Sequence, residues 1–206
     1  APAPLTSTSA AATSSTVTMA TLPTCKLAIS IYPAFAYDAS GGGGTAVTTH
    51  PASDAADLPA GVPPPPASAT ALAFNPATVT IPTLNWRTTR FLGLPLPPGL
   101  EIAVTPRALG GWVDRPSGQA ALAFTADFQF SAFGLYRPPI IPVITLLSTE
   151  GVQGEQLTGQ GRRLAGGTAR LAGVARVPVL TDPILSWFLR LPADCLAEMD
   201  AVFDFQ

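Results

Sequence analysis

The sequence contains few charged residues. Charged side chains make up 12% of the 206 residues, about half of the roughly 25% found in typical soluble domains. Eleven Lys and Arg against thirteen Asp and Glu give a net charge of −2 and a pI near 5.2. Without a basic stripe the chain lacks the charge that nucleic-acid binding requires. A GC-rich genome explains the excess of Arg over Lys, but the low total charge also fits a surface covered by a partner or a membrane.

Histidine and cysteine are almost missing. The one histidine, His50, lies in a Gly/Pro/Ala-rich stretch, where nothing would hold it as a catalytic base. Cys25 and Cys195 are 170 positions apart, so they cannot form a local zinc site. Two free thiols are favoured over one disulfide, and both arrangements stay open. We therefore expect no metal and no cofactor.

Other catalytic patterns are absent as well. Gly41–Gly44 continues into Thr45 without the Lys that a phosphate-binding loop requires. Asp127 and Glu101 alternate outward on expected strands, and such a pair of acids could serve a carboxylate-based hydrolase if the two met in a cleft. This is the weakest hypothesis, and the sequence predicts a protein that is not an enzyme.

Long apolar runs and long helices are also excluded. No stretch of 18 apolar residues occurs, so the sequence predicts no transmembrane helix. Twenty-three prolines, about twice the usual share, interrupt helices but are compatible with turns and strand edges.

What remains is a pattern of short alternating strands. We expect strands at 26–32, 69–74, 78–81, 100–104, 109–113, 120–130, 143–149, 155–164, 169–177 and 202–205, and short helices at 182–191 and 193–200. Residues 109–113 and 120–130 form a hairpin in this prediction, as do the two segments that flank Gly166-Gly167. The fold class predicted is all-β, an antiparallel β-sandwich or β-barrel with one or two short C-terminal helices.

Two segments do not fit the β pattern. Residues 1–24 are rich in Ala, Ser and Thr, contain no acid and resemble the end of an organelle transit peptide. We expect 1–24 to be a disordered arm and 25–206 to be a single β domain with a Gly/Pro-rich loop at 41–68.

The strongest candidate site is an apolar, proline-rich segment at 90–99. It is either a buried crossover between strands or an exposed loop that inserts into a membrane interface or a partner's groove. Apolar residues elsewhere would extend the exposed patch. The candidate partner- or membrane-binding residues are Arg90, Phe91, Leu92, Leu94, Leu96, Tyr136, Arg137, Trp187, Phe188 and Leu189.

A second candidate is the phenylalanine-rich face of the strand at 120–130. Phe124, Phe128 and Phe130 point to the same side of that strand. They either pack in a core or line the cavity of a barrel, because a barrel of about eight strands can hold one small ligand.

Three stretches resemble a family of small proteins of cyanobacteria and plastids with no established activity. They are Ile29 to Gly44, which includes YDASGGGG, Phe91 to Leu100, which reads FLGLPLPPGL, and Phe128 to Pro139. The resemblance covers roughly residues 26–200 and implies a photosynthetic, plastid setting, but no catalytic residue.

Two functions follow as expectations. The first is a non-enzymatic accessory or assembly protein of the chloroplast, at the stroma or the thylakoid surface. It would dock on a thylakoid membrane complex such as a photosystem through the apolar Pro-rich loop, with peripheral membrane contact and no nucleic acid. The alternative is a β-barrel that binds a lipid, a carotenoid or another apolar small molecule.

Overall fold

The structure is a computed structural model that describes residues 15–56 and 58–206. The part of the predicted arm at 1–14 lies outside the described residues. The strands are β1 (Thr16–Ile29), β2 (Phe35–Tyr37), β3 (Gly43–Thr49), β4 (Thr70–Phe74), β5 (Thr89–Phe91), β6 (Leu94–Pro95), β7 (Leu100–Asp114), β8 (Gln119–Ala132), β9 (Ile141–Ser148), β10 (Gly151–Gln153), β11 (Thr158–Gln160), β12 (Arg162–Ala165), β13 (Thr168–Val177) and β14 (Ala193–Phe205). The helices are α1 (Pro183–Leu189) and two 3-10 turns, η1 (Ala52–Asp54) and η2 (Pro76–Thr78).

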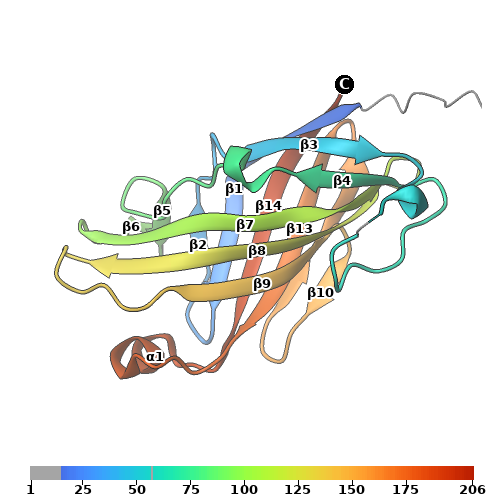
Figure 1. The fold of residues 1–206 in the computed structure, drawn as a ribbon. Helices are drawn as coiled ribbons and strands as arrows, with labels where there is room; N and C mark the ends of the chain where they lie inside the picture. The colour runs from blue at the N-terminus through green and yellow to red at the C-terminus, as the bar shows by residue number, and fades with distance from the viewer. Residues whose placement is uncertain (1–14, 57) are drawn as a thin grey trace, which may run out of the picture.

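Eight strands close into a ring (Figure 1). Following the antiparallel pairings around the ring gives the order β1, β14, β13, β9, β8, β7, β4, β3 and back to β1. The all-β prediction is confirmed, and the closed ring makes the fold barrel-like. The weakest join is between β13 and β9, which pair in register only at Ala172 and Ser148.

One end of the barrel is wider than the other, because β1 changes partner along its length. Its first part pairs with β3, and after a register irregularity between Thr21 and Cys25 its second part pairs with β2. β2 pairs with β5, and β5 with β6, while an isolated bridge from Leu84 to Ile102 ties the intervening segment to β7. These extra strands enlarge the circumference at this end, and the interior of a β-barrel widens with strand number.

The narrow end is filled with side chains. Val17, Leu72, Val113, Leu122 and Leu171 are nearly inaccessible to solvent and belong to one hydrophobic core. Because these side chains pack from strands all around the ring, they close this end of the barrel. Any space for a ligand must therefore lie toward the wide end.

The β10–β11 hairpin covers the outer face of β14. Asp194 accepts hydrogen bonds from the backbone N–H groups of Gln156 and Leu157, at 2.6 and 3.1 Å, and Glu198 accepts one from Gln160 at 2.9 Å. These acids point outward from the barrel, yet they are buried under the hairpin. Their hydrogen bonds offset the loss of hydration that burial of a carboxylate involves.

Two segments predicted to be irregular are strands. Residues 16–24, assigned to the disordered arm, lie within β1, where Val17 and Met19 alternate into the core. The loop predicted at 41–68 contains β3, in which Gly43 allows close packing, because a Cβ there would lie 2.0 Å from the Met19 carbonyl oxygen. The rest of that loop packs against Trp112, whose indole N–H donates to the Pro63 carbonyl oxygen at 2.8 Å.

The C-terminal prediction is half right. The helix predicted at 182–191 is α1, with Asp182 as N-cap accepting from the Leu185 N–H at 2.7 Å. The helix predicted at 193–200 is wrong, because that segment belongs to β14. Its acids, Asp194, Glu198 and Asp200, are outward-facing residues of this strand, and the β10–β11 hairpin covers Asp194 and Glu198.

Candidate functional site

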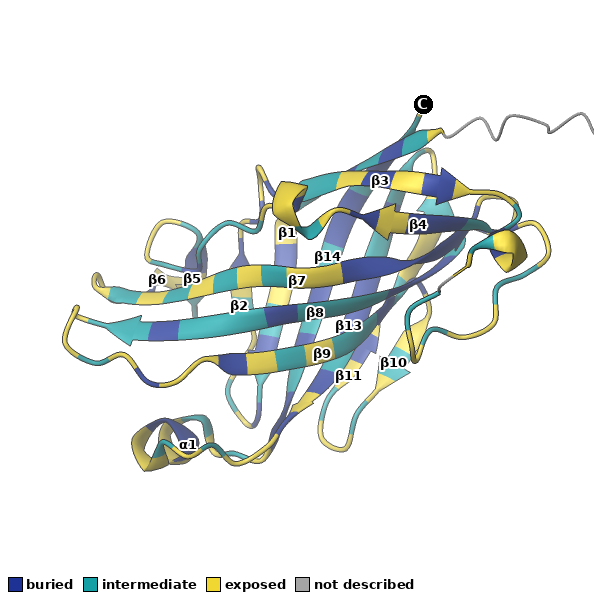
Figure 2. Cartoon of the chain, viewed as in Figure 1, coloured by how far each residue is buried: buried dark blue, intermediate teal, exposed yellow. Residues whose placement is uncertain are grey.

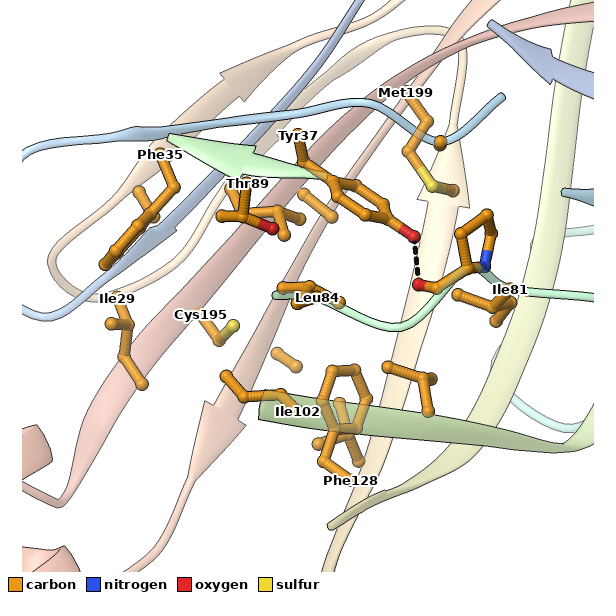
Figure 3. Close-up of a pocket in the computed structure, with 18 of the residues that line it drawn as sticks. Ile29, Phe35, Tyr37, Ile81, Leu84, Thr89, Ile102, Phe128, Cys195 and Met199 are labelled. Atoms are coloured by element: carbon orange, nitrogen blue, oxygen red, sulfur yellow. Dashed lines mark hydrogen bonds between the residues drawn. The ribbon is translucent and has the colours of Figure 1, made fainter. Parts of the chain in front are cut away.

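The wide end of the barrel holds an apolar cavity of about 430 Å³. Figure 3 shows Tyr37, Leu84, Ile102, Phe128 and other lining side chains facing this space from several strands. The volume falls within the roughly 300–1,000 Å³ typical of small-molecule sites. A single ligand of modest size would therefore fit in the interior of the barrel, enclosed by its strands.

Side-chain accessibility shows that this space is not filled by the protein. Ile102 and Val104 on β7, and Phe124 and Phe128 on β8, line the cavity but are only half-buried. Farther along the same two strands, toward the narrow end, Val113 and Leu122 are fully buried. Side chains with the same inward direction are thus packed at one end and accessible at the other, as expected where a core gives way to a cavity.

Among the residues that the structure describes, no charged side chain lines the cavity. Most of its polar groups are already paired: the Tyr37 hydroxyl donates to the Pro82 carbonyl oxygen at 2.5 Å, and the Thr21 hydroxyl donates to the Ala39 carbonyl oxygen at 2.6 Å. Burial raises the pKa of Tyr37, so this hydroxyl stays neutral. An interior of this kind favours uncharged, apolar molecules, since a charged group would lose its hydration without gaining a partner.

One polar atom of the lining has no partner. The Thr145 hydroxyl on β9 is the single buried side-chain nitrogen or oxygen without a hydrogen bond among residues 15–56 and 58–206. It packs against Gly173 on β13, where an added Cβ would lie 2.9 Å from the hydroxyl oxygen. This contact lies beside the join where β9 and β13 have only one pair in register.

Both cysteines are free, so the two-thiol alternative describes this structure. Cys195 faces the cavity, whereas Cys25 packs with Tyr37 and Leu84. Burial raises the pKa of each thiol to about 11, and the nearby Asp194 carboxylate adds to the effect for Cys195. Neutral thiols add to the apolar character of this end.

Helix α1 lies against the wide end. Phe188 contributes to the cavity lining and has its ring centroid 6.1 Å from that of Tyr32 and 6.4 Å from that of Phe130. Pro97 also lines the cavity, and both Pro97 and Phe188 are exposed to solvent. The cavity therefore reaches the surface between α1 and the β6–β7 connection, which we call the mouth.

Large exposed apolar residues gather around this mouth. Among the described residues, ten of the thirteen lie in β6 or in the connections β1–β2, β5–β6, β8–β9 and β13–β14, which the strand register places at the wide end. Figure 2 shows exposed residues on α1 and on the neighbouring connections. We call this set the apolar rim: Ile31, Leu92, Leu94, Phe133, Leu135, Ile140, Val179, Ile184, Trp187 and Phe188.

The structure places all ten residues predicted from the sequence at this end of the barrel. Leu92, Leu94, Trp187 and Phe188 belong to the apolar rim, and Arg90 and Arg137 are exposed next to it. Phe91, Leu96 and Leu189 line the cavity, and Leu96 is buried there rather than exposed. Tyr136 donates a hydrogen bond to Asp182 at 2.7 Å and so joins the β8–β9 connection to α1. Burial and the nearby Asp182 carboxylate raise the pKa of Tyr136.

Sequence reasoning missed the cavity residues on β1, β9 and β14. Ile29, Thr145 and Met199 line the cavity. Each occupies one of the alternate positions of its strand that face the interior of the barrel. The alternation in β9 and β14 was the available signal, but it does not reveal whether an inward side chain meets other side chains or empty space.

The other candidate groups do not converge. Asp127 is paired with Arg107, at 2.7 Å from its Nε, and neither Asp127 nor Glu101 lines the cavity. His50 is exposed, with Nδ1 3.2 Å from the Thr70 hydroxyl. Within the described part of the chain, no cluster of three or more metal-ligating side chains is present.

No protein-family model, curated protein or solved structure matches the chain. The resemblance to a cyanobacterial and plastid family therefore stays a prediction. In the region that the structure describes, no helix has the length and apolar character needed to cross a bilayer.

Proposed function

We propose that the protein binds a neutral, apolar small molecule in the cavity at the wide end of the barrel. The observation that carries this proposal is a preformed cavity of about 430 Å³ whose lining has no charged side chain. Cavities lined by apolar groups stay dry and take up apolar molecules, because a ligand restores the contacts that the lining lacks.

The lining also indicates the class of ligand. Phe124, Phe128 and Phe130 offer ring faces and edges to a flat or chain-like hydrocarbon, and the few polar side-chain groups are hydroxyls and one thiol. A lipid alcohol, a lipid ester or a terpenoid of suitable size fits this chemistry. A carboxylate buried in the cavity would be unpaired, and we expect a long-chain alcohol to bind at least tenfold more tightly than the fatty acid of equal length at neutral pH.

The proposal is tested by filling the cavity from within. Ala197 is half-buried although its strand, β14, has neighbours on both sides, because it faces the cavity. The variant Ala197→Phe should place a ring where the ligand would lie. Ala103 on β7 is exposed and does not line the cavity, so Ala103→Phe is the matched control.

Binding of the neutral fluorescent probe N-phenyl-1-naphthylamine would be measured for the wild type and both variants. We expect saturable binding of one probe per chain, weakened at least tenfold by Ala197→Phe and unchanged by Ala103→Phe. Thermal unfolding would show that Ala197→Phe is folded. Probe binding that is absent, or that a folded Ala197→Phe leaves unchanged, would reject the proposal.

A further inference from the structure

The mouth of the cavity is surrounded by a surface that combines apolar side chains with unpaired positive charge. Trp187 and Leu135 in the apolar rim are 80% and 94% exposed, far more than a packed side chain. A group of exposed apolar side chains gathered at one end of a domain is typical of an interaction site. The nature of its partner is indicated by the charges that accompany it.

Three arginines stand among the rim residues. Arg90 is next to Phe91 in β5, Arg137 lies in the β8–β9 connection, and Arg190 ends α1 beside the mouth. All three are exposed, and none has an ion-pair partner in the described part of the chain. The acids nearest the three arginines are Asp182, which is engaged by Tyr136 and by the start of α1, and the exposed Glu101 at the start of β7, so positive charge is in excess at this end.

This positive end contrasts with the rest of the molecule. The whole chain has a net charge of −2, and six of its eleven basic residues form salt bridges with acids away from the rim. Exposed Trp, Phe and Leu together with unpaired Arg form the composition that binds the interface of an anionic bilayer, where rings and aliphatic chains insert and guanidinium groups meet headgroups.

We propose that the apolar rim docks on an anionic lipid membrane and holds the mouth of the cavity against the bilayer. An apolar ligand would then pass between bilayer and cavity without crossing water, which is the costly step for such a molecule. This transfer rests on the proposed ligand binding, whereas docking itself does not. A thylakoid protein complex, expected from the sequence, is the competing partner of the rim. The positive charge of the exposed arginines and the position of the apolar rim around the cavity mouth favour lipid.

Docking is tested by flotation with protein-free vesicles of phosphatidylcholine, with and without phosphatidylglycerol. The full chain should float with the anionic vesicles and only weakly with the neutral ones. The variant Leu92→Ser/Leu135→Ser/Trp187→Ser should lose binding by on the order of 100-fold. The variant Arg90→Gln/Arg137→Gln/Arg190→Gln should lose the preference for anionic vesicles, also on the order of 100-fold.

Matched controls come from surfaces away from the mouth. Val47 on β3 and Ile144 on β9 are exposed apolar residues outside the rim, and Arg115 lies in the turn at the opposite end of the β7–β8 hairpin. Val47→Ser/Ile144→Ser and Arg115→Gln should float like the wild type. Each variant would also be tested for thermal unfolding and for N-phenyl-1-naphthylamine binding.

The two proposals fail in different ways. Absence of flotation with anionic vesicles, or equal losses in rim and control variants, overturns docking while leaving probe binding intact. Binding to native thylakoid membranes that is lost after protease treatment, with no binding to protein-free vesicles, assigns the rim to a protein and also overturns it. Normal flotation of a chain that binds no probe overturns the proposed ligand binding instead.

Discussion

The Tyr32 hydroxyl donates a hydrogen bond to the Phe188 carbonyl oxygen at 2.5 Å, and the two rings also lie against each other. Tyr32 follows β1 and Phe188 belongs to α1, so this contact joins α1 to the barrel wall at the mouth. With the bond from Tyr136 to Asp182, it forms two polar attachments of α1 to the wide end. Leu185 of α1 is buried against Phe130, Ile141 and Val177 and keeps the helix on the wall, while the Tyr32 bond holds its Phe188 end at the mouth.

Removing the Tyr32 hydroxyl should therefore speed ligand exchange. Tyr32→Phe keeps the ring contact with Phe188 and loses one hydrogen bond, worth about 0.5–1.5 kcal/mol. The probe dissociation rate, measured by stopped-flow displacement, should rise about 2- to 10-fold, with little change in unfolding temperature. The control is Thr18→Val, which removes a hydroxyl 3.4 Å from that of Thr45 on β3, at a residue that does not line the cavity. An unchanged dissociation rate in Tyr32→Phe would show that α1 does not limit exchange.

Thr145 should be a site where a less polar residue stabilises the protein. Its hydroxyl is buried without a partner, and such a group costs about 1–3 kcal/mol. Thr145→Val has nearly the same shape and should raise the free energy of unfolding by roughly 1 kcal/mol. Thr21→Val, in contrast, removes a hydroxyl that donates to the Ala39 carbonyl oxygen, which then keeps only its bond from the Gly42 N–H, so the lost hydrogen bond should lower stability. Chemical denaturation of both variants makes the comparison, and equal effects would contradict it.

The row of acids under the β10–β11 hairpin should make stability depend on pH. Burial alone would raise the pKa of Asp194, but the hydrogen bonds from Gln156, Leu157 and Arg176 outweigh it and lower that pKa. The pKa of Glu198 is lowered in the same way, against its burial, by Lys26 and the Gln160 N–H. Carboxyls with a lowered folded pKa stabilise the protein above their unfolded values, about 3.9 for Asp and 4.3 for Glu.

The stability that Asp194 and Glu198 contribute should be present in full near neutral pH and lost as the pH falls below about 4. Asp194→Asn removes the negative charge that accepts hydrogen bonds from two backbone N–H groups and from Arg176. It should therefore lower the free energy of unfolding by on the order of 2–4 kcal/mol at pH 7. The cost should shrink at low pH, where Asp194 itself becomes protonated. Asp204→Asn, at an exposed position of the same strand, is the control. A cost for Asp194→Asn that stays constant between pH 7 and pH 3 would contradict this account.

The sequence predicts the all-β class and four residues of the apolar rim, Leu92, Leu94, Trp187 and Phe188, but it leaves open whether the phenylalanine face lines a cavity. Alternation of Phe124 and Phe128 with polar residues predicts their strand and its inward face, because side chains of a strand alternate between faces. Whether those rings meet a packed core depends on the circumference of the barrel, which is set by β2 and β5 inserting beside β1. Those strands have three residues each and leave almost no periodic signal.

The errors have a related cause. Residues 16–24 look disordered because they end a segment rich in Ala, Ser and Thr, yet pairing with β3 and β14 satisfies their backbone and only Val17 and Met19 need to be buried. The sequence predicts a helix at 193–200, although this segment pairs with β1 and β13 and a hairpin distant in sequence covers its Glu198. Long-range pairing decides both cases, and local composition does not report it.

Cys195 offers a direct chemical probe of the cavity. Its thiol faces the cavity, and burial with the nearby Asp194 raises its pKa from 9.0 to about 11. The thiolate is the reactive form, so this change should lower the reactive fraction at pH 8 about 100-fold. In a Cys25→Ala background, Cys195 should react with a neutral thiol reagent far more slowly than a small-molecule thiol.

A ligand in the cavity should slow this reaction further, since it would occupy the space through which the reagent reaches the sulfur. The measurement is the labelling rate by mass spectrometry at pH 8, with and without a saturating long-chain alcohol. Ala197→Phe should mimic the ligand, while Ala103→Phe should not. Because the thiol pKa is raised, the rate should climb through pH 9–11 as the thiolate forms. A rate equal to that of a free thiol, or one indifferent to both ligand and Ala197→Phe, would place Cys195 outside a ligand-accessible cavity.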